Sequence, residues 1–242
     1  MRLKVDVIVA GGSGDIRAAK EATTTIPIVM AQDPDPVGNR FVASLARPGG
    51  NITGLATLRP KISGKQLELL KEIIPKLSRV AVFGTSTLPG NSQNIRELEL
   101  AAKAFSVQIQ SLDVLEPKDF ATAFRAANKG RAQAALMMVA GAVVGGHRTE
   151  IAELAVKSRL PVIYDDPTYV EAGGLMTYGV NRSDLDRRAA TYVDKILKGR
   201  TPADLPVEQP MKFEFIVNLK AAKAIGLTIP PNVLVRADKV IR

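Results

Sequence analysis

Short apolar runs alternate with amphipathic stretches along nearly the whole chain, and turns containing Gly, Ser, Asp or Pro separate them. Short apolar runs bounded by turns are typical of buried strands, and longer amphipathic stretches are typical of helices that cover a sheet. The pattern predicts strands at 5–10, 26–30, 51–58, 80–83, 107–112, 134–139, 161–164, 175–178 and 212–217. It predicts helices at 13–22, 37–46, 61–74, 92–105, 117–128, 147–158 and 183–197.

This alternation predicts an α/β protein with parallel sheets covered by helices on both faces. The length of 242 residues leaves two α/β lobes or one large domain open at this point. Ligand sites in such sheets lie beyond the carboxyl ends of the strands. The turns that follow the predicted strands therefore hold the candidate site residues.

Two of these turns place small polar residues before a predicted helix. The first, 11–15, contains Ser13 between glycines, and the second, 85–92, contains Thr85, Ser86 and Asn91. Glycines let a ligand approach the backbone closely, and a helix start offers unpaired amides, so the first turn is suited to a carboxylate. Two such turns facing one another across a cleft could grip both ends of a zwitterion. Ordinary helix capping is the alternative for both turns.

A third group follows the strand at 161–164 and includes Asp165 and Asp166, with Tyr178 on the next predicted strand. Carboxylates at a strand end can bind an ammonium group through charge-assisted hydrogen bonds. Capping of a short helix that begins near Pro167 is the alternative. A glycosidase-type pair requires opposed, separated carboxyl groups, which neighbouring residues on one turn do not provide.

The sequence lacks the usual signatures of catalysis and cofactor binding. It has no Cys, which excludes thiolate nucleophiles and Cys-ligated metals. His147 is the only histidine, and no Gly-x-Ser-x-Gly elbow accompanies it, so we interpret it as a surface or capping residue. Gly12-Ser13-Gly14 matches the start of the dinucleotide-binding motif G-x-G-x-x-G, but Arg17 occupies the position of its final glycine. We expect no enzyme, no cofactor and no metal.

The formal net charge of +9 raises the possibility of an anionic partner such as nucleic acid. However, Lys and Arg are scattered among acidic residues, aromatic residues make up 5%, and there is no Trp to stack on bases. We therefore expect no nucleic-acid partner. No apolar run reaches the roughly 18 residues of a membrane span, and the first residues show no export signal.

An ordered series of segments resembles the family of ABC-transporter substrate-binding proteins that includes the tryptophan- and tyrosine-type binding proteins. In the second half these segments include 171–179 (EAGGLMTYG) and 187–199 (RRAATYVDKILKG). The others are 5–9, 25–29, 47–54, 202–210 and 227–231. The resemblance covers essentially the whole chain.

The resemblance implies the type I periplasmic-binding-protein fold, in which hinge strands join two Rossmann-like lobes that close on a ligand. It assigns residues 1–76 and 174–201 to lobe 1 and residues 77–173 and 202–242 to lobe 2. It implies a small-molecule solute, an ABC membrane permease as partner, and a periplasmic or membrane-associated extracytoplasmic location. The solute would be an amino acid or a small organic acid. The interlobe cleft would be lined by Ser13, Asp33, Thr85, Ser86, Asn91, Ala140, Gly141, Asp165 and Tyr178.

The chain departs from the family pattern in three places. Relatives usually carry a signal peptide and further strand–helix units before the stretch that matches Val5, so lobe 1 is expected to be incomplete. An incomplete lobe would expose a sheet edge that favours a homodimer. The turns at 140–142 and 88–91 differ from the corresponding turns of the relatives, and both are expected to contact the ligand. A ligand-sensing module of a regulator or receptor, and an α/β enzyme or nucleotide-binding protein, remain alternatives.

Overall fold

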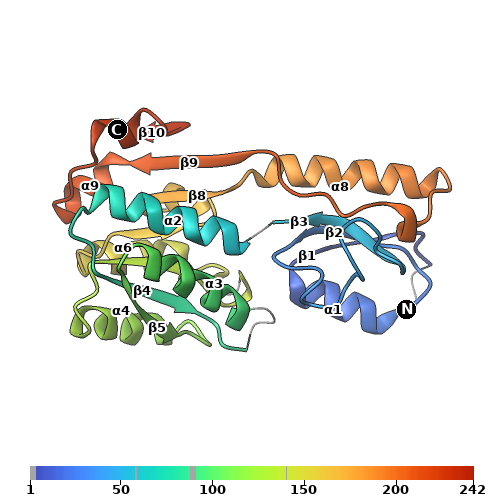
Figure 1. Cartoon of the computed structure of the whole chain (residues 1–242), viewed down its shortest axis with the longest axis horizontal. Helices are drawn as coiled ribbons and strands as arrows, with labels where there is room; N and C mark the ends of the chain where they lie inside the picture. Colours follow the sequence, from blue (N-terminus) through green and yellow to red (C-terminus); the bar gives the residue numbers. More distant parts are fainter. Residues whose placement is uncertain (1–3, 58, 88–90, 140) are drawn as a thin grey trace. The chain divides into compact units, whose positions relative to one another are not determined.

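The computed structural model describes residues 4–57, 59–87, 91–139 and 141–242 (Figure 1). It forms two compact units, each made from two separate stretches of the chain. Unit 1 comprises 1–59 and 180–212, and unit 2 comprises 60–179 and 213–242. The chain therefore crosses between the units after residues 59, 179 and 212.

Unit 1 contains a parallel three-stranded sheet in the order β1-β2-β3. Helices α1 and α8 lie on its two faces (Figure 1), because α1 packs on β1 and β2 whereas α8 packs on β2 and β3. Apolar residues of the strands, α1 and the loop after β2 form the core of the unit. The elements are β1 (Ile8–Gly11), α1 (Ser13–Ala22), β2 (Ile28–Asp33), β3 (Ile52–Ala56), α8 (Arg182–Leu197) and the 3-10 helix η1 (Pro202–Asp204).

The segment from Leu205 to Glu208 runs beside β3 and completes unit 1 on that side. Thr53 Oγ1 donates a 2.6 Å hydrogen bond to the Leu205 carbonyl. Glu208 N donates to Gly54 O at 3.0 Å, and Ala56 N donates to Glu208 O at 2.9 Å. These bonds bind a late stretch of the sequence to a strand from the first quarter of the chain.

Unit 2 contains a seven-stranded sheet in the order β10-β9-β8-β7-β6-β4-β5. Neighbouring strands from β5 to β8 are parallel, and so are β9 and β10. Asn181 N donates to Lys212 O and Asn218 N to Leu175 O, which pairs β8 and β9 in opposite directions. The strands are β4 (Arg79–Gly84), β5 (Gln108–Asp113), β6 (Ala134–Met138), β7 (Val162–Tyr164), β8 (Met176–Val180), β9 (Phe213–Asn218) and β10 (Lys239–Ile241).

Helices cover both faces of this sheet, and the side-chain alternation of β4 shows why. Val80 and Val82 lie in one apolar cluster with α2, α3 and α9, whereas Ala81 and Phe83 lie in a second cluster with α4 and α6. Successive strand residues point to opposite faces, so an all-apolar strand requires cover on both sides. The helices are α2 (Arg59–Ile73), α3 (Asn91–Ala104), α4 (Asp119–Lys129), α5 (Gly141–Val144), α6 (Arg148–Lys157), α7 (Thr168–Glu171), α9 (Leu219–Ile225) and α10 (Pro231–Leu234).

The predicted helix at 37–46 is wrong, because these residues form turns and bends. Asp35 Oδ1 accepts the Gly38 amide at 2.9 Å, and Ser44 Oγ accepts the Arg47 amide at 3.0 Å. Short polar side chains that bond nearby amides compete with helical hydrogen bonds. Arg40 adopts a left-handed φ of 58°, which also interrupts a right-handed helix.

The boundaries of the units differ from the predicted lobes, 1–76 with 174–201 and 77–173 with 202–242. Helix α2 belongs to unit 2, because Leu67 and Leu70 pack in the same cluster as Val80 and Val82. Residues 202–212 belong to unit 1, because the segment after η1 bonds to β3 and buries Val207 in the unit 1 core. Within the described residues, no helix is both long enough and apolar enough to cross a membrane.

Candidate functional site

In unit 1, the carboxyl ends of β1 and β2 are joined by a cluster of three buried polar side chains. Ser13, the first residue of α1, donates through Oγ to Asp33 Oδ2 at 2.7 Å. Asn39 Nδ2 donates to Asp33 Oδ1 at 3.0 Å and to Ser13 Oγ at 3.2 Å. The predicted residues Ser13 and Asp33 are thus brought together, and Asn39, which the sequence analysis missed, joins them.

The carboxylate of Asp33 is fully enclosed, with 0% of the residue exposed. Burial raises the pKa of this carboxyl, and the hydrogen bonds from Ser13, Asn39 and the Asp35 amide oppose the rise. A buried charge requires such partners, because desolvation without them is costly. Through these hydrogen bonds, Asp33 fixes the turn before α1 and the loop after β2. Contact of Ser13 or Asp33 with a ligand stays a prediction.

In unit 2, the strand order places a topological switch beside β4. The chain passes from β4 to β5 on one side and then returns to β6 on the other. In open α/β sheets, ligands bind outside the carboxyl ends of the strands at such a point. Thr85 and Ser86 directly follow β4. Gly141 begins α5 after β6, and the predicted residue Ala140 lies outside the described residues.

Thr85, Ser86 and Asn91 have different environments in the turn after β4. Thr85 is buried and donates to the Val114 carbonyl at 3.0 Å. Ser86 is exposed, and its hydroxyl donates to Asp113 Oδ2 at 2.6 Å while its amide donates to Oδ1 at 2.8 Å. Asn91 begins α3 and is buried. Ser86 and its partner Asp113 are therefore a polar pair that this turn presents to solvent.

The neighbouring carboxylates Asp165 and Asp166 differ in role. Asp166 Oδ1 accepts the amide of Thr168 at 3.0 Å and its hydroxyl at 2.7 Å, so Asp166 caps the turn that starts α7. Asp165 is half-buried and follows β7 directly. The adjacent strand approaches it closely, because a Cβ on Gly179 would lie 2.1 Å from the Asp165 carbonyl oxygen. The capping interpretation fits Asp166, whereas a ligand role for Asp165 stays a prediction.

Tyr178 lies on β8 with its ring packed among other aromatic rings. It lies parallel to Phe213, with ring centroids 6.0 Å apart, and meets the edge of Phe215 at 6.4 Å. Partial burial raises the pKa of the Tyr178 hydroxyl, and the charge of Lys65 opposes this effect. Tyr178 is thus a neutral aromatic residue at physiological pH, available for stacking or hydrogen bonding.

Gln66, on α2, connects β7 and β8 and was not predicted. Its Nε2 donates to the carbonyls of Tyr164 at 3.1 Å and Tyr178 at 2.8 Å, and the residue is only 2% exposed. Both amide hydrogens are therefore used to hold the two strands that carry Asp165 and Tyr178. A glutamine on an amphipathic helix gives no sequence signal for such a role.

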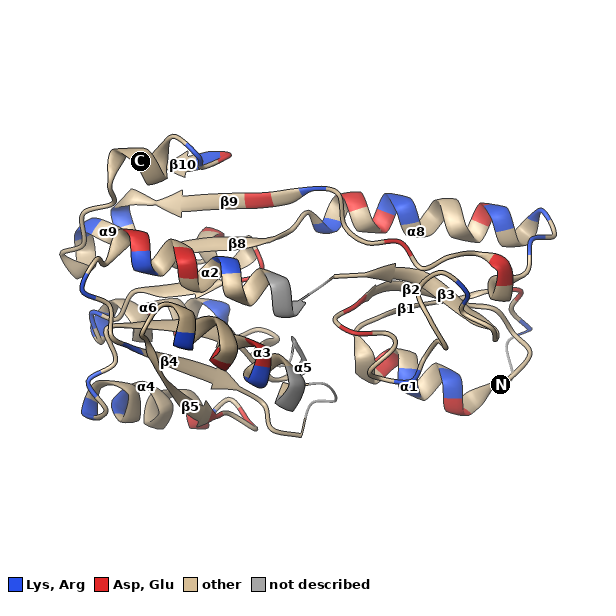
Figure 2. Ribbon diagram, in the orientation of Figure 1, with Lys and Arg blue, Asp and Glu red and all other residues tan. Residues whose placement is uncertain are grey.

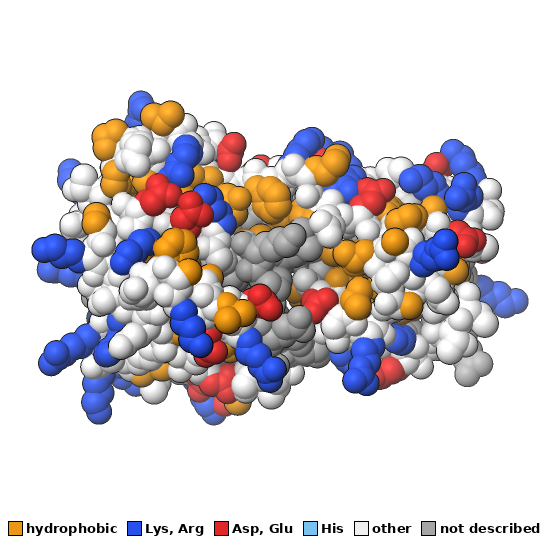
Figure 3. Space-filling view, in the orientation of Figure 1, with side chains coloured by type: hydrophobic (Ala, Val, Ile, Leu, Met, Phe, Trp, Pro, Cys, Tyr) orange, Lys and Arg blue, Asp and Glu red, His pale blue; other side chains and the backbone are white. Residues whose placement is uncertain are grey.

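The surface of the chain carries many charges without one continuous basic area in the view shown. Figure 2 shows basic and acidic positions interspersed along α2 and α8. Figure 3 shows Lys and Arg spread over the visible face with acidic side chains among them. His147 lies at the surface before α6, where Nδ1 is 2.9 Å from Glu150 Oε2. Among the described residues, no group of three or more acidic, His or Cys side chains is arranged to hold a metal ion.

The sequence model of the ABC transporter substrate binding protein family matches residues 2–241. The chain belongs to this family. One relative is the tyrosine-binding protein of Clostridioides difficile (strain R20291), which is 25% identical to this chain over 224 residues. That match covers 93% of this chain, and the chain spans 64% of the length of that relative.

Two solved structures of similar proteins agree with the family assignment. A conserved domain protein of Vibrio cholerae is 29% identical with a TM-score of 0.90, covering 98% of this chain and 79% of that chain. An ABC domain from Streptococcus pneumoniae in complex with L-Trp is 24% identical with a TM-score of 0.88, covering 98% and 81%. These matches confirm the predicted fold class. The family is one of substrate-binding proteins, which agrees with the expectation of a binding protein rather than an enzyme.

Proposed function

We propose that this chain is the solute-binding component of an ABC importer and that its solute is an amino acid. The family match over residues 2–241 is the observation that carries the proposal. The names of two similar proteins support the ligand class, since one is a tyrosine-binding protein and the other was crystallised with L-Trp. An extracytoplasmic location and an ABC permease as partner are parts of the same proposal.

The chemistry of unit 2 supports an amino-acid ligand. Asp165 offers a half-buried carboxylate that can accept from an ammonium group. The Ser86 turn lies at the switch point, and the aromatic ring of Tyr178 can contact an aromatic side chain. A binding position in the interlobe cleft, as the family resemblance implies, belongs to the proposal.

A thermal-unfolding screen tests this function. The protein is heated with each of the twenty amino acids and with small organic acids, and hits are confirmed by isothermal titration calorimetry. A ligand at 100 times its Kd stabilises the folded state by about 2.7 kcal/mol, which gives a clear rise in Tm. Stabilisation by L-Tyr or L-Trp, with the D-enantiomers inactive, supports the proposal. No stabilisation by any compound at millimolar concentration contradicts it.

The predicted homodimer is not part of this proposal. It rested on the expectation that an incomplete lobe 1 exposes a sheet edge; in the described residues β1 stands at one end of the unit 1 sheet. Sedimentation velocity at several protein concentrations distinguishes a monomer from such a dimer directly.

A further inference from the structure

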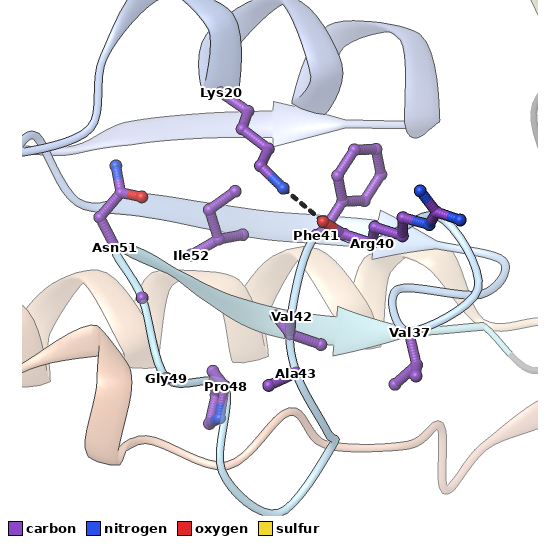
Figure 4. A pocket seen from close by; sticks show the side chains of 11 residues that line it. Lys20, Val37, Arg40, Phe41, Val42, Ala43, Pro48, Gly49, Asn51 and Ile52 are labelled. Atoms are coloured by element: carbon purple, nitrogen blue, oxygen red, sulfur yellow. Dashed lines mark hydrogen bonds between the residues drawn. The ribbon is translucent and has the colours of Figure 1, made fainter.

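A cavity of about 490 Å³ opens in unit 1 between the end of α1 and the loop that joins β2 to β3 (Figure 4). Its volume is in the range of small-molecule sites, which is roughly 300–1,000 Å³. Two cations, Lys20 and Arg40, and the aromatic residue Phe41 line it. The remaining lining residues are apolar or glycine, apart from Asn51: Val37, Val42, Ala43, Pro48, Gly49, Gly50 and Ile52.

Two cations lie near the ring of Phe41, and a third is its neighbour in the chain. Arg17 Cζ lies 5.5 Å and Lys20 Nζ 6.0 Å from the ring centroid, and Arg40 precedes Phe41. No acidic residue lines the cavity. In the part of the chain that the structure describes, none of the three cations forms an ion pair. An anion placed here gains attraction from several positive charges and relieves their mutual repulsion.

The cavity wall is held in place by the protein itself. Lys20 Nζ donates to the Arg40 carbonyl, shown as a dashed line in Figure 4, so the ammonium is directed to this site with further donors to spare. Arg40 N donates to Val37 O at 2.9 Å, which supports the left-handed backbone of Arg40. The Lys20 ammonium is therefore positioned before any ligand arrives, and Arg40 is fixed at its backbone.

This cavity is separate from the polar cluster of unit 1. Asn51 donates to the Ile26 carbonyl at 2.8 Å, which places that end of the cavity at the amino edge of β2 and β3. Ser13 and Asp33 lie at the opposite, carboxyl edge. Along α1, Ser13 and Lys20 are seven residues apart, a rise of about 10 Å.

We propose that this cavity is a second binding site that takes a small organic carboxylate with an apolar body. The carboxylate contacts Lys20 and Arg40, and the apolar body lies against Val42, Pro48 and Ile52. Glycines at 49 and 50 leave backbone accessible at the wall, since a Cβ on Gly50 would meet no atom within 4 Å. The site does not depend on the proposed amino-acid function.

Benzoate is the probe that tests this site, with ¹⁵N-labelled protein observed by two-dimensional NMR. We expect saturable shifts of the Gly49, Gly50 and Ile52 amide resonances, and these shifts persist when L-Tyr or L-Trp is present at saturation. Benzyl alcohol, which has the ring without the charge, and inorganic phosphate, which has charge without the ring, each bind about tenfold more weakly.

The variants Lys20→Met and Arg40→Met each weaken benzoate binding about tenfold, because each removes a charge-assisted hydrogen bond. Lys198→Met is the matched control, since Lys198 is exposed and pairs with Asp194 on α8. The proposal is overturned by shifts that stay linear with benzoate concentration, by equal binding of benzyl alcohol, or by unchanged affinity in both variants. Shifts confined to residues 85–91 and 165 would also overturn it and would place benzoate at the amino-acid site.

Discussion

Ser13 Oγ donates a 2.7 Å hydrogen bond to Asp33 Oδ2, and this bond links the carboxyl ends of two neighbouring parallel strands. The two residues are 20 positions apart, at the first residue of α1 and the last residue of β2. Because Asn39 bonds to both residues, the same cluster also fixes the loop that follows β2. The local geometry of unit 1 therefore depends on one buried carboxylate.

Asp33→Ala should lower the free energy of unfolding by about 2–3 kcal/mol, because it leaves the buried polar atoms of Ser13 and Asn39 without a partner. Urea denaturation followed by circular dichroism measures the change. Asp15→Ala on the exposed surface of α1 is the control and should change stability by less than about 0.5 kcal/mol. An equal effect of the two substitutions would show that the cluster contributes nothing specific.

Asp33 should also make stability depend on pH. Burial raises the folded-state pKa above the unfolded value of about 3.9, so the folded state binds the proton more tightly. Its contribution is greatest below the unfolded pKa and decreases as pH rises through the folded pKa. Asp33→Asn does not titrate, so the wild type should lose stability relative to this variant over that window. Unfolding curves at half-unit pH steps measure the difference, and parallel pH profiles would refute the expectation.

Asp165→Ala should weaken binding of the amino-acid ligand about tenfold while leaving the fold intact, since it removes a charge-assisted partner for an ammonium group. Asp166→Ala, at the neighbouring residue, is the matched control. It removes the cap of the turn that starts α7 and should lower the free energy of unfolding by about 1 kcal/mol, with little effect on the affinity for the amino acid. Calorimetric titration and thermal unfolding of both variants separate the two roles. Wild-type affinity in Asp165→Ala would remove this residue from the site.

Gly179→Ala should destabilise unit 2 by more than about 2 kcal/mol, because the new Cβ would lie 2.1 Å from the Asp165 carbonyl oxygen. Gly14→Ala provides the contrast, since a Cβ there meets no atom within 4 Å and Ala favours the helix by roughly 1 kcal/mol. Chemical denaturation of the two variants should give changes of opposite sign. A neutral Gly179→Ala would mean that β7 and β8 separate at little cost.

Most strands and helices could be predicted because their apolar periodicity reflects burial on one face or both. The stretch 37–46 could not, because its apolar residues mimic a helix while Asp35 and Ser44 bond to neighbouring amides. The same error hid Asn39, whose amide reaches Asp33 only through the turns of that loop.

At the site, the sequence identified the residues at the strand ends but not the side chains that hold them in place by hydrogen bonds. Ser86 was predicted, whereas its partner Asp113 ends a different strand and no local spacing connects the two. Gln66 was missed for a related reason, since only the packed α2 brings its amide between the carbonyls of Tyr164 and Tyr178. Supports that depend on contacts across the sheet are not encoded by short-range patterns.

The attachment of the Leu205–Glu208 segment to β3 also affects the order in which the nascent chain can fold. Unit 1 begins with the first strand but needs residues beyond 200 to close the β3 side, so it cannot be completed early in translation. The central stretch 60–179 emerges before that closing segment, although its own sheet waits for β9 and β10. Unit 1 therefore has all of its residues only at 212 and unit 2 only at 242, and a chain released before residue 212 would leave both units unfinished.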